Sequence, residues 1–373
     1  MSDVKEMTRE LLSNAERDAL HDVGFESESA RAATSVLADV AVKLAQSNDA
    51  GVEIMPLSEA LRTYDFVQDL MFGLVDPDEN EHIALVAEHM HDPLGHFVWI
   101  KPGAKVRLPV QTFSMLETPQ ARQFTHDVML VDEGAEVETV SGAAVLSSVH
   151  KGRHVSVGET YLRPGSKCTS VSLEHWGQGM EVYSYGYSRM EHGAQSNTTS
   201  IALSPIRHHE SHSHAVLEED TTSVSQAVCF APEGTKRVIK STTRLAGDGA
   251  KSEDITRMVS SGGVIVNEAL LIGDAAGTEG FLGCDGLKLG PAGEIMAVPA
   301  LRARTEGAQL SHEASIGMID REKLSYLMAS GMDEDSARDL IVQGFLSLDD
   351  ARLPEMTKAR VKEMTALAKS GGM

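Results

Sequence analysis

The run Val128-Met129-Leu130-Val131 is followed by the turn Glu133-Gly134-Ala135, and the same pattern returns as Val155-Ser156-Val157 followed by Pro164-Gly165-Ser166. Short apolar runs that alternate with glycine-bearing turns are typical of β-strands joined at tight corners. A recurrence near thirty residues favours a parallel β-helix, in which each coil buries its inward side chains against the next coil. A Greek-key sandwich or a double-stranded barrel gives a similar local pattern, so both stay open as alternatives.

Three more turns of this kind follow, at residues 192–194, 233–235 and 248–250. Gly134, Gly165 and Gly193 are separated by 31 and 28 residues, whereas the next two gaps, to Gly234 and then to Gly249, are 41 and 15. The pattern therefore predicts a β-rich core over residues 96–311 without a strict period.

The N-terminal residues 1–95 are expected to form a helical module. A shorter apolar stripe, which starts at Met7, precedes a longer one that has the spacing of one helix face. The longer stripe consists of Ala33, Val36, Leu37, Val40 and Leu44.

A C-terminal helical segment is expected over residues 312–373. Asp320 is suited to cap a helix that Gly331 ends, and Asp333 to cap a second helix that ends at Gly344. Pro354 suits the first turn of a last helix. The chain therefore reads as helical, then β-rich, then helical.

The net charge of the chain indicates which classes of binding partner are not expected. Its 373 residues include 33 basic and 55 acidic side chains, a net charge of −22. Such a surface repels nucleic-acid phosphates and anionic membranes, so neither is an expected partner. The sequence has no run of 18 apolar residues and no apolar signal-peptide core, which predicts a cytoplasmic protein.

Three cysteines, Cys168, Cys229 and Cys284, are spread through the β-rich region without a C-x-x-C pair. This spacing argues against a disulfide framework, a zinc ribbon and a permanent four-thiolate iron–sulfur cluster within one chain. The sequence also contains neither a phosphate-binding G-x-x-x-x-G-K-[ST] loop nor a G-x-S-x-G motif. The chain is therefore not expected to hydrolyse ATP by itself.

A dense histidine run between residues 208 and 214 is the most conspicuous local feature. On a strand, His212 and His214 point to one face, and the nearby Glu218 could join them on a metal ion, as in half of a cupin-type site. The alternative is a polar strand edge or turn.

A second candidate site combines one thiol, Cys284, with the adjacent pair His312 and Glu313. A thiolate, an imidazole and a carboxylate all ligate iron, and a mixed, incomplete set suits a site that holds a cluster briefly and releases it. Alternatively, Cys284 belongs to the core and the His–Glu pair caps the following helix.

The motifs around this site occur in a fixed order: C-D-G-L-x-L from Cys284, P-x-L-x-A from Pro299, L-S-H-E-A-x-I-G from Leu310, Y-L-M-x-x-G from Tyr326, and a capped helix ending in G-F at Phe345. In this respect the chain resembles the SufB/SufD family, the scaffold subunits of the SUF machinery for iron–sulfur cluster assembly. It is most similar to the compact archaeal-type SufB, also called SmsB. The resemblance implies a right-handed parallel β-helix with helical ends.

The resemblance also implies a partner and a site. Members of the family work with SufC, an ABC-type ATPase, which agrees with the missing phosphate loop. By matching motifs, Cys284 and Glu313, with His312 beside them, would hold a transient cluster at a subunit interface. The C-terminal helices, including Tyr326, Arg338 and Phe345, would dock on the ATPase.

Several positions depart from the bacterial SufB pattern. Residues 151–155 lack the cysteine that accepts sulfur there, Glu174-His175-Trp176 replaces a Q-N-W-like segment, and Ser188 stands where a tunnel lysine is expected. Ser311 replaces an acidic residue before the His–Glu pair. Cys168 could substitute for the missing cysteine, or free sulfide could be used.

One chain offers too few ligands to enclose a cluster. We therefore expect a homodimer through the β-helix, with one ATPase per chain, in which Cys284 and Glu313 of both copies converge. ATP-driven dimerisation of the ATPases would reshape this interface, and the cluster would pass to recipient apoproteins. The chain itself would be a scaffold and not an enzyme. The alternatives are a cupin-like mononuclear metalloenzyme and a SufD-like structural partner of the ATPase.

Overall fold

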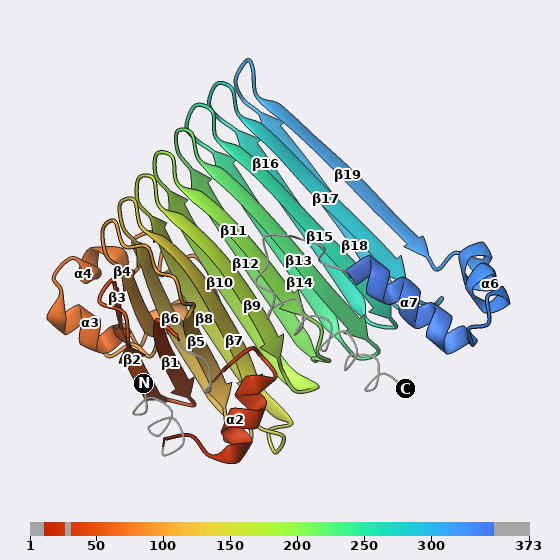
Figure 1. The fold of residues 1–373 in the computed structure, drawn as a ribbon, viewed down its shortest axis with the longest axis horizontal. Helices are drawn as coiled ribbons and strands as arrows, with labels where there is room; N and C mark the ends of the chain where they lie inside the picture. The colour runs from red at the N-terminus through yellow and green to blue at the C-terminus, as the bar shows by residue number, and fades with distance from the viewer. Residues whose placement is uncertain (1–10, 27–30, 347–373) are drawn as a thin grey trace.

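The computed structural model describes residues 11–26 and 31–346 and shows a parallel β-helix with helices at both ends (Figure 1). From β4 onward, successive strands alternate between two sheets, and each pairs in parallel with the strand two places further along the chain. The predicted β-helix is therefore confirmed, and the sandwich and the double-stranded barrel are excluded.

The first sheet, sheet A, has ten strands in the order β19-β17-β15-β13-β11-β9-β7-β5-β1-β2. Their bounds are β1 (Ala33–Ala38), β2 (Ala41–Ser47), β5 (Val110–Leu116), β7 (Glu136–Val145), β9 (Lys167–His175), β11 (Gln195–Ala202), β13 (Thr222–Pro232), β15 (Lys251–Ser261), β17 (Glu279–Lys288) and β19 (Gln309–Met318).

The second sheet, sheet B, has nine strands in the order β18-β16-β14-β12-β10-β8-β6-β4-β3. Their bounds are β3 (Val52–Pro56), β4 (His96–Ile100), β6 (Arg122–Val131), β8 (Lys151–Leu162), β10 (Gly179–Met190), β12 (His208–Leu217), β14 (Lys236–Leu245), β16 (Val264–Gly273) and β18 (Glu294–Ala303).

The glycine turns form two separate columns, which explains their irregular spacing. Gly134, Gly165, Gly193 and Gly249 all have positive φ and lie where the chain passes from sheet B to sheet A. In this column Asp220, with φ 55°, occupies the position where the expected glycine is missing. Gly234 lies at the opposite corner, between β13 and β14. The turns of one column hydrogen bond to each other, as from the Gly134 amide to the Pro164 carbonyl at 2.9 Å.

The predicted helix over residues 33–44 is wrong. This segment forms the antiparallel hairpin of β1 and β2, with Asp39 at φ 47° and Val40 78% exposed at its tip. All six residues of β1 are buried, because Val36 packs with Leu20 and Phe25 in one apolar cluster and Ala33 packs with Ile54 in another. Burial on both faces removes the alternation that would mark a strand, so the apolar positions imitate a helical stripe.

The described residues of the N-terminal part include four helices: α2 (Asn14–His21), α3 (Leu57–Thr63), α4 (Val67–Leu70) and α5 (Glu81–Ala87). A capping box between Ser13 and Glu16 begins α2, and Leu20 of α2 packs on the outer face of sheet A. Met7 lies outside the described residues. The N-terminal region is thus a mixture of short helices and strands.

The C-terminal helices are α6 (Arg321–Ala329) and α7 (Glu334–Leu346). The predicted caps are confirmed, since Asp320 accepts the Glu322 amide at 2.8 Å and Asp333 accepts the Ser336 amide at 2.9 Å. Gly331, with φ 99°, follows α6, but α7 continues through Gly344, so the predicted end at that glycine is wrong. The helix predicted after Pro354 lies outside the described residues. In the part of the chain that is described, no helix is long and apolar enough to cross a membrane.

Candidate functional site

Cys284 lies on β17, next to the last strand of sheet A. Its neighbours in register are Thr256 on β15 and Ala314 on β19. Strand alternation points its side chain between the two sheets, where it is 2% exposed and packs in a cluster that includes Cys229, Met258 and Ile295. The sulfur is therefore inside the β-helix and not on its surface.

Two polar side chains interrupt the apolar surroundings of this sulfur. The Asn267 side-chain amide of β16 donates a hydrogen bond to the Cys284 sulfur at 3.3 Å. Burial raises the pKa of the Cys284 thiol, the negative charge of Asp254 on β15 adds to that rise, and the Asn267 hydrogen bond partly offsets it. Cys284 is therefore a protonated thiol at neutral pH in this state, and it must be exposed or bound by metal to react as a thiolate.

His312 and Glu313 lie in the middle of β19, so they do not cap a helix. His312 pairs with Leu282 and Glu313 pairs with Gly283. Because side chains alternate along a strand, His312 shares the inward face with Cys284, whereas Glu313 lies on the opposite, outer face. Both residues are exposed. Within one chain the structure thus brings His312, but not Glu313, to the face that carries the thiol.

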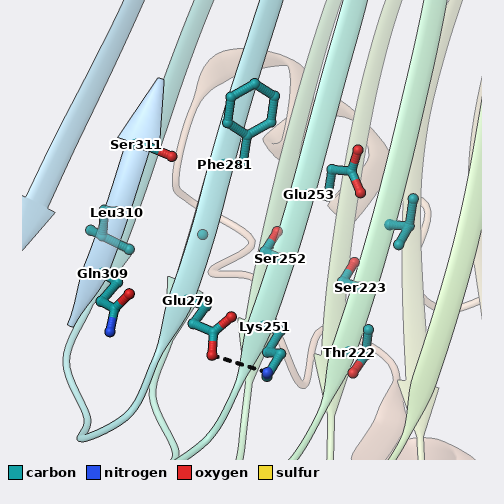
Figure 2. Close-up of a pocket in the computed structure, with 12 residues that line it drawn as sticks. Thr222, Ser223, Lys251, Ser252, Glu253, Glu279, Phe281, Gln309, Leu310 and Ser311 are labelled. Atoms are coloured by element: carbon teal, nitrogen blue, oxygen red, sulfur yellow. Dashed lines mark hydrogen bonds and ion pairs between the residues drawn. The ribbon is translucent and has the colours of Figure 1, made fainter. Parts of the chain in front are cut away.

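The outer face beside Glu313 is a shallow groove at the start of the last strands of sheet A (Figure 2). Phe281 and Glu253 rise from its floor, Ser311 lies beside Phe281, and Lys251 pairs with Glu279 at 3.0 Å. Glu313 follows two residues after Ser311 on the same face of β19. Gly283, its partner in register, adds no side chain, which leaves the Glu313 carboxylate open to solvent.

The end of the β-helix next to Cys284 is open. β18 and β19 are the last strands of their sheets, so each has an unpaired edge in the described chain. Several large apolar side chains on these strands are exposed: Met296, Val298, Ile316 and Met318. A long edge with exposed apolar side chains is a template for pairing with another chain.

The three residues expected to contact an ATPase differ in their surroundings. Tyr326 on α6 is 73% exposed. Arg338 on α7 forms an ion pair with Glu334 at 2.8 Å and donates to the Leu289 carbonyl at 3.2 Å, which ties α7 to the loop after β17. Phe345 is half-buried against the outer core of sheet A. Only Tyr326 is therefore fully available to a partner.

The histidine run does not form a cupin-type site. His212 and His214 lie on one face of β12, as expected, but His212 hydrogen bonds to Glu210 at 2.7 Å and its ring contacts the tilted ring of Tyr185. Glu218 instead pairs with Arg189 at 2.6 Å. The cupin alternative is wrong, because the parallel coil replaces the double-stranded barrel and Glu218 is bound elsewhere.

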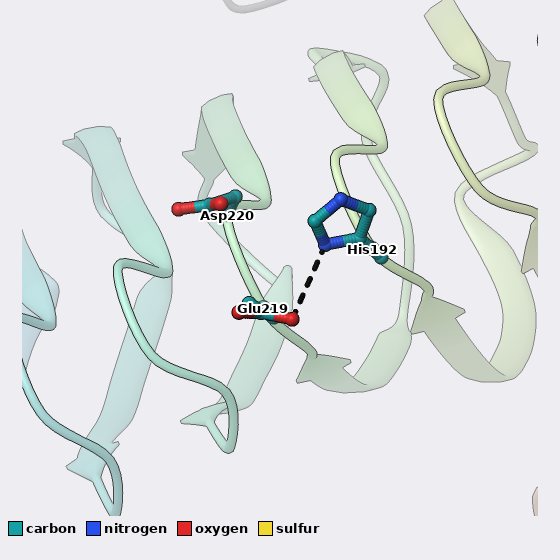
Figure 3. Close-up of side chains that lie close together, drawn as sticks. All are labelled: His192, Glu219 and Asp220. Carbon is teal, nitrogen blue, oxygen red and sulfur yellow. Dashed lines mark ion pairs between the residues drawn. The ribbon is translucent and has the colours of Figure 1, made fainter.

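Another acidic group lies at the corner column of turns. Among the described residues, His192, Glu219 and Asp220 are the three side chains whose ligand atoms all lie within 4.8 Å of each other (Figure 3). His192 and Glu219 form an ion pair at 3.4 Å, and all three are exposed. Exposed carboxylates gather in this way without an ion, so this group alone does not indicate a metal site.

A cavity of about 490 Å³ lies between the two sheets. Its wall is rich in serine and threonine side chains, such as Ser170, Thr198 and Ser225 on sheet A and Ser188 on sheet B. Cys168 also lines it, and burial raises the pKa of the Cys168 thiol to about 11. Cys168 thus faces the interior, which leaves its proposed sulfur role open to test.

Two buried polar residues next to Cys284, Asp254 and Asn267, were not predicted from the sequence. They lie on β15 and β16, and both point into the interior. Residues 251–254 are all polar, so the sequence does not show which face of this strand points inward.

Comparison with known proteins identifies the family. The family model described as SUF system FeS cluster assembly, SufBD core domain, matches residues 114–345. A SufBD family protein of Archaeoglobus fulgidus is 31% identical over 95% of each chain. Another, from Methanothermobacter thermautotrophicus, is 29% identical over 95% of this chain and 88% of its own length. The iron–sulfur cluster assembly protein SufB of Bacillus subtilis is 22% identical over 78% of this chain and 63% of its own length. Together with the parallel β-helix, these matches show that the chain belongs to the SufBD family and has a role in the assembly of iron–sulfur clusters.

Proposed function

We propose that this chain is a scaffold that assembles iron–sulfur clusters with a SufC-type ABC ATPase, in the cytoplasm, and passes them to recipient apoproteins. In this proposal the partner hydrolyses ATP and the scaffold is not an enzyme. The observation that carries the proposal is that Cys284 lies one strand inside an open, apolar end of the β-helix. A thiol at this depth is close to any second subunit that pairs with β19.

The ligands of the nascent cluster would come from two copies of the chain. One chain offers Cys284 and His312 on its inner face and Glu313 on its outer face, fewer ligands than a cluster commonly has. A two-fold interface that joins the exposed edges of β18 and β19 would bring both sets to one seam. The exposed Ile316 and Met318 would be buried in that seam.

Access to Cys284 requires movement, because the thiol is 2% exposed. The last strand, β19, covers its edge, and α6 begins three residues after β19 ends. Tyr326, Met328 and Leu340 on α6 and α7 are exposed apolar side chains that a docked ATPase could cover. Movement of these helices when the ATPase dimerises would displace β19 and open the seam.

Anaerobic reconstitution with iron and sulfide tests this proposal. Cys284→Ser should abolish formation of the oxygen-sensitive cluster, read by Mössbauer spectroscopy, while the complex with the ATPase stays intact. Cys229→Ser is the matched control, because Cys229 lies in the same apolar cluster. Unchanged cluster yield in Cys284→Ser would refute the role of this thiol.

The SufD-like alternative remains testable in the same experiment. A structural partner of the ATPase would bind it through α6 and α7 without forming a cluster of its own. The burial of Cys284 is the observation that favours this alternative. A wild-type complex that binds the ATPase but forms no cluster under any nucleotide condition would establish it.

A further inference from the structure

The interior of the β-helix leads toward Cys284 along rows of hydroxyl groups. Thr139, Ser170, Thr198 and Ser225 occupy one register position on β7, β9, β11 and β13, and Asp254 on β15 continues the same row. Strand alternation points this row into the cavity, and these five residues line it. A cavity of this size with a polar wall holds water, so small ions can enter it.

The end of the cavity that Asp254 lines should attract a cation. Among the described residues that line the cavity, none is lysine or arginine, and Asp254 brings a carboxyl group into it. The Ser241 hydroxyl from sheet B hydrogen bonds to this carboxyl group. A carboxylate that faces a cavity without a basic partner is a natural ligand for a metal ion.

The side chain of Asn267, next to Cys284, provides a second and independent observation. Asn267 is 1% exposed, and its side-chain oxygen has no hydrogen-bond partner, while its amide nitrogen donates to the Cys284 sulfur at 3.3 Å. A buried acceptor left unpaired in a native fold calls for a water or an ion. Cys284 lies two residues beyond Leu282, the register partner of Asp254, so the thiol and the carboxyl group are diagonal neighbours on one inner face.

We propose that Asp254, which lines the cavity, forms an interior site for one divalent transition-metal ion together with its neighbours Asn267 and Cys284. The carboxylate and amide oxygens would bind the ion, and the thiol would lose its proton to cavity water as the sulfur binds. Such a mixed oxygen and sulfur set suits iron(II), cobalt(II) or zinc(II) better than magnesium or calcium. That the physiological ion is ferrous iron, stored before cluster assembly, rests on the proposed function.

Cobalt(II) titration of the full chain under anaerobic conditions tests the site. One ion should bind per chain with a thiolate-to-cobalt charge-transfer band, and excess magnesium should not displace it. Asp254→Asn and Asn267→Leu should each weaken cobalt binding at least tenfold, and Cys284→Ser should remove the band. Ser225→Ala is the matched control, because it removes a hydroxyl from the next strand of the same row. Circular dichroism and Tm verify that each variant is folded.

Wild-type cobalt affinity and an unchanged band in Asp254→Asn would overturn the interior site, as would a wild-type complex without a thiolate band. Glu313→Gln separates the two proposals, because Glu313 lies on the outer face and should leave cobalt binding unchanged. If cobalt binds as expected but reconstitution never yields a cluster, the scaffold function fails and the metal site stands. If clusters form but Asp254→Asn binds cobalt normally, the metal site fails alone.

Discussion

Replacing Glu174 by glutamine should change how the stability of this protein depends on pH. Glu174 is the penultimate residue of β9, and its carboxyl group lies 3.3 Å from the Nδ1 atom of His209 on β12. Burial lowers the pKa of His209 to about 3, with the nearby charge of Arg237 adding to it, so this imidazole is neutral and does not compensate the carboxylate. Burial raises the pKa of Glu174 from its ordinary 4.5 to about 7, and the attraction of Arg237 offsets only part of the rise.

The sign and size of the effect follow from proton linkage. Between pH 4.5 and 7 the folded protein keeps the Glu174 proton and the unfolded chain has lost it, so the free energy of unfolding falls as pH rises. The proton difference between the folded and unfolded states acts over roughly two pH units between pH 5 and pH 8. At ~1.4 kcal/mol per unit, the free energy of unfolding should therefore fall by about 2.5 kcal/mol over this range. Glu174→Gln lacks this contribution at every pH.

Urea unfolding at pH 5 and pH 8 measures the effect. The stability difference between wild type and Glu174→Gln should shift by about 2.5 kcal/mol between the two pH values, in favour of the variant at pH 8. Glu138→Gln, an exposed carboxylate on β7, is the control and should show no comparable shift. A pH-independent difference between wild type and Glu174→Gln would refute the assignment of a buried, protonated carboxyl group.

Three further outcomes are expected. Gly134→Ala should destabilise the fold by about 1–2 kcal/mol, because Gly134 has a φ of 63°. Gly158 lies in a strand with equally open space around it and no positive φ, so Gly158→Ala should have no such effect. Equal effects of the two substitutions in thermal unfolding would contradict this reasoning. Tyr326→Ala should weaken ATPase binding about tenfold in calorimetry and leave Tm unchanged. Leu324 is only 8% exposed, so Leu324→Ala should instead lower Tm. An unchanged affinity of the Tyr326→Ala variant would show that this side chain is not in the interface. Ile316→Lys should give a monomer in light scattering if the open end is the dimer seam, and a persistent dimer would place the seam elsewhere.

The overall fold was predictable because turn chemistry is local. Gly134, Gly165 and Gly193 adopt the positive φ that these turns need, and glycine is the residue that adopts it most readily, so the turns could be recognised from the sequence. The irregular gaps came from two features that sequence spacing cannot separate: Gly234 belongs to the other corner, and Asp220 adopts a left-handed conformation without being glycine. The β1–β2 hairpin was missed because β1 is buried on both faces, so its apolar residues do not alternate as those of a half-buried strand do.

The neighbourhood of the strands that carry the proposed site residues was predictable, but the orientation of their side chains was not. The motifs place Cys284 and Glu313 29 residues apart, and pairing of β17 with β19 does bring their strands together. Whether two side chains share a face depends on a register that shifts by single residues. In the structure Glu313 aligns with Gly283 and not with Cys284, so the two side chains lie on opposite faces.

The rows of hydroxyl groups also constrain how this molecule can change over evolution. Every coil contributes one side chain to each row, so inserting or deleting one residue within a strand would turn polar groups outward and apolar groups into the water-filled space. Length can therefore vary without damage at the corners, or by the gain or loss of an entire coil. A chain that gained one coil would keep every row intact and would enclose a chamber longer by a single strand spacing, about 4.8 Å.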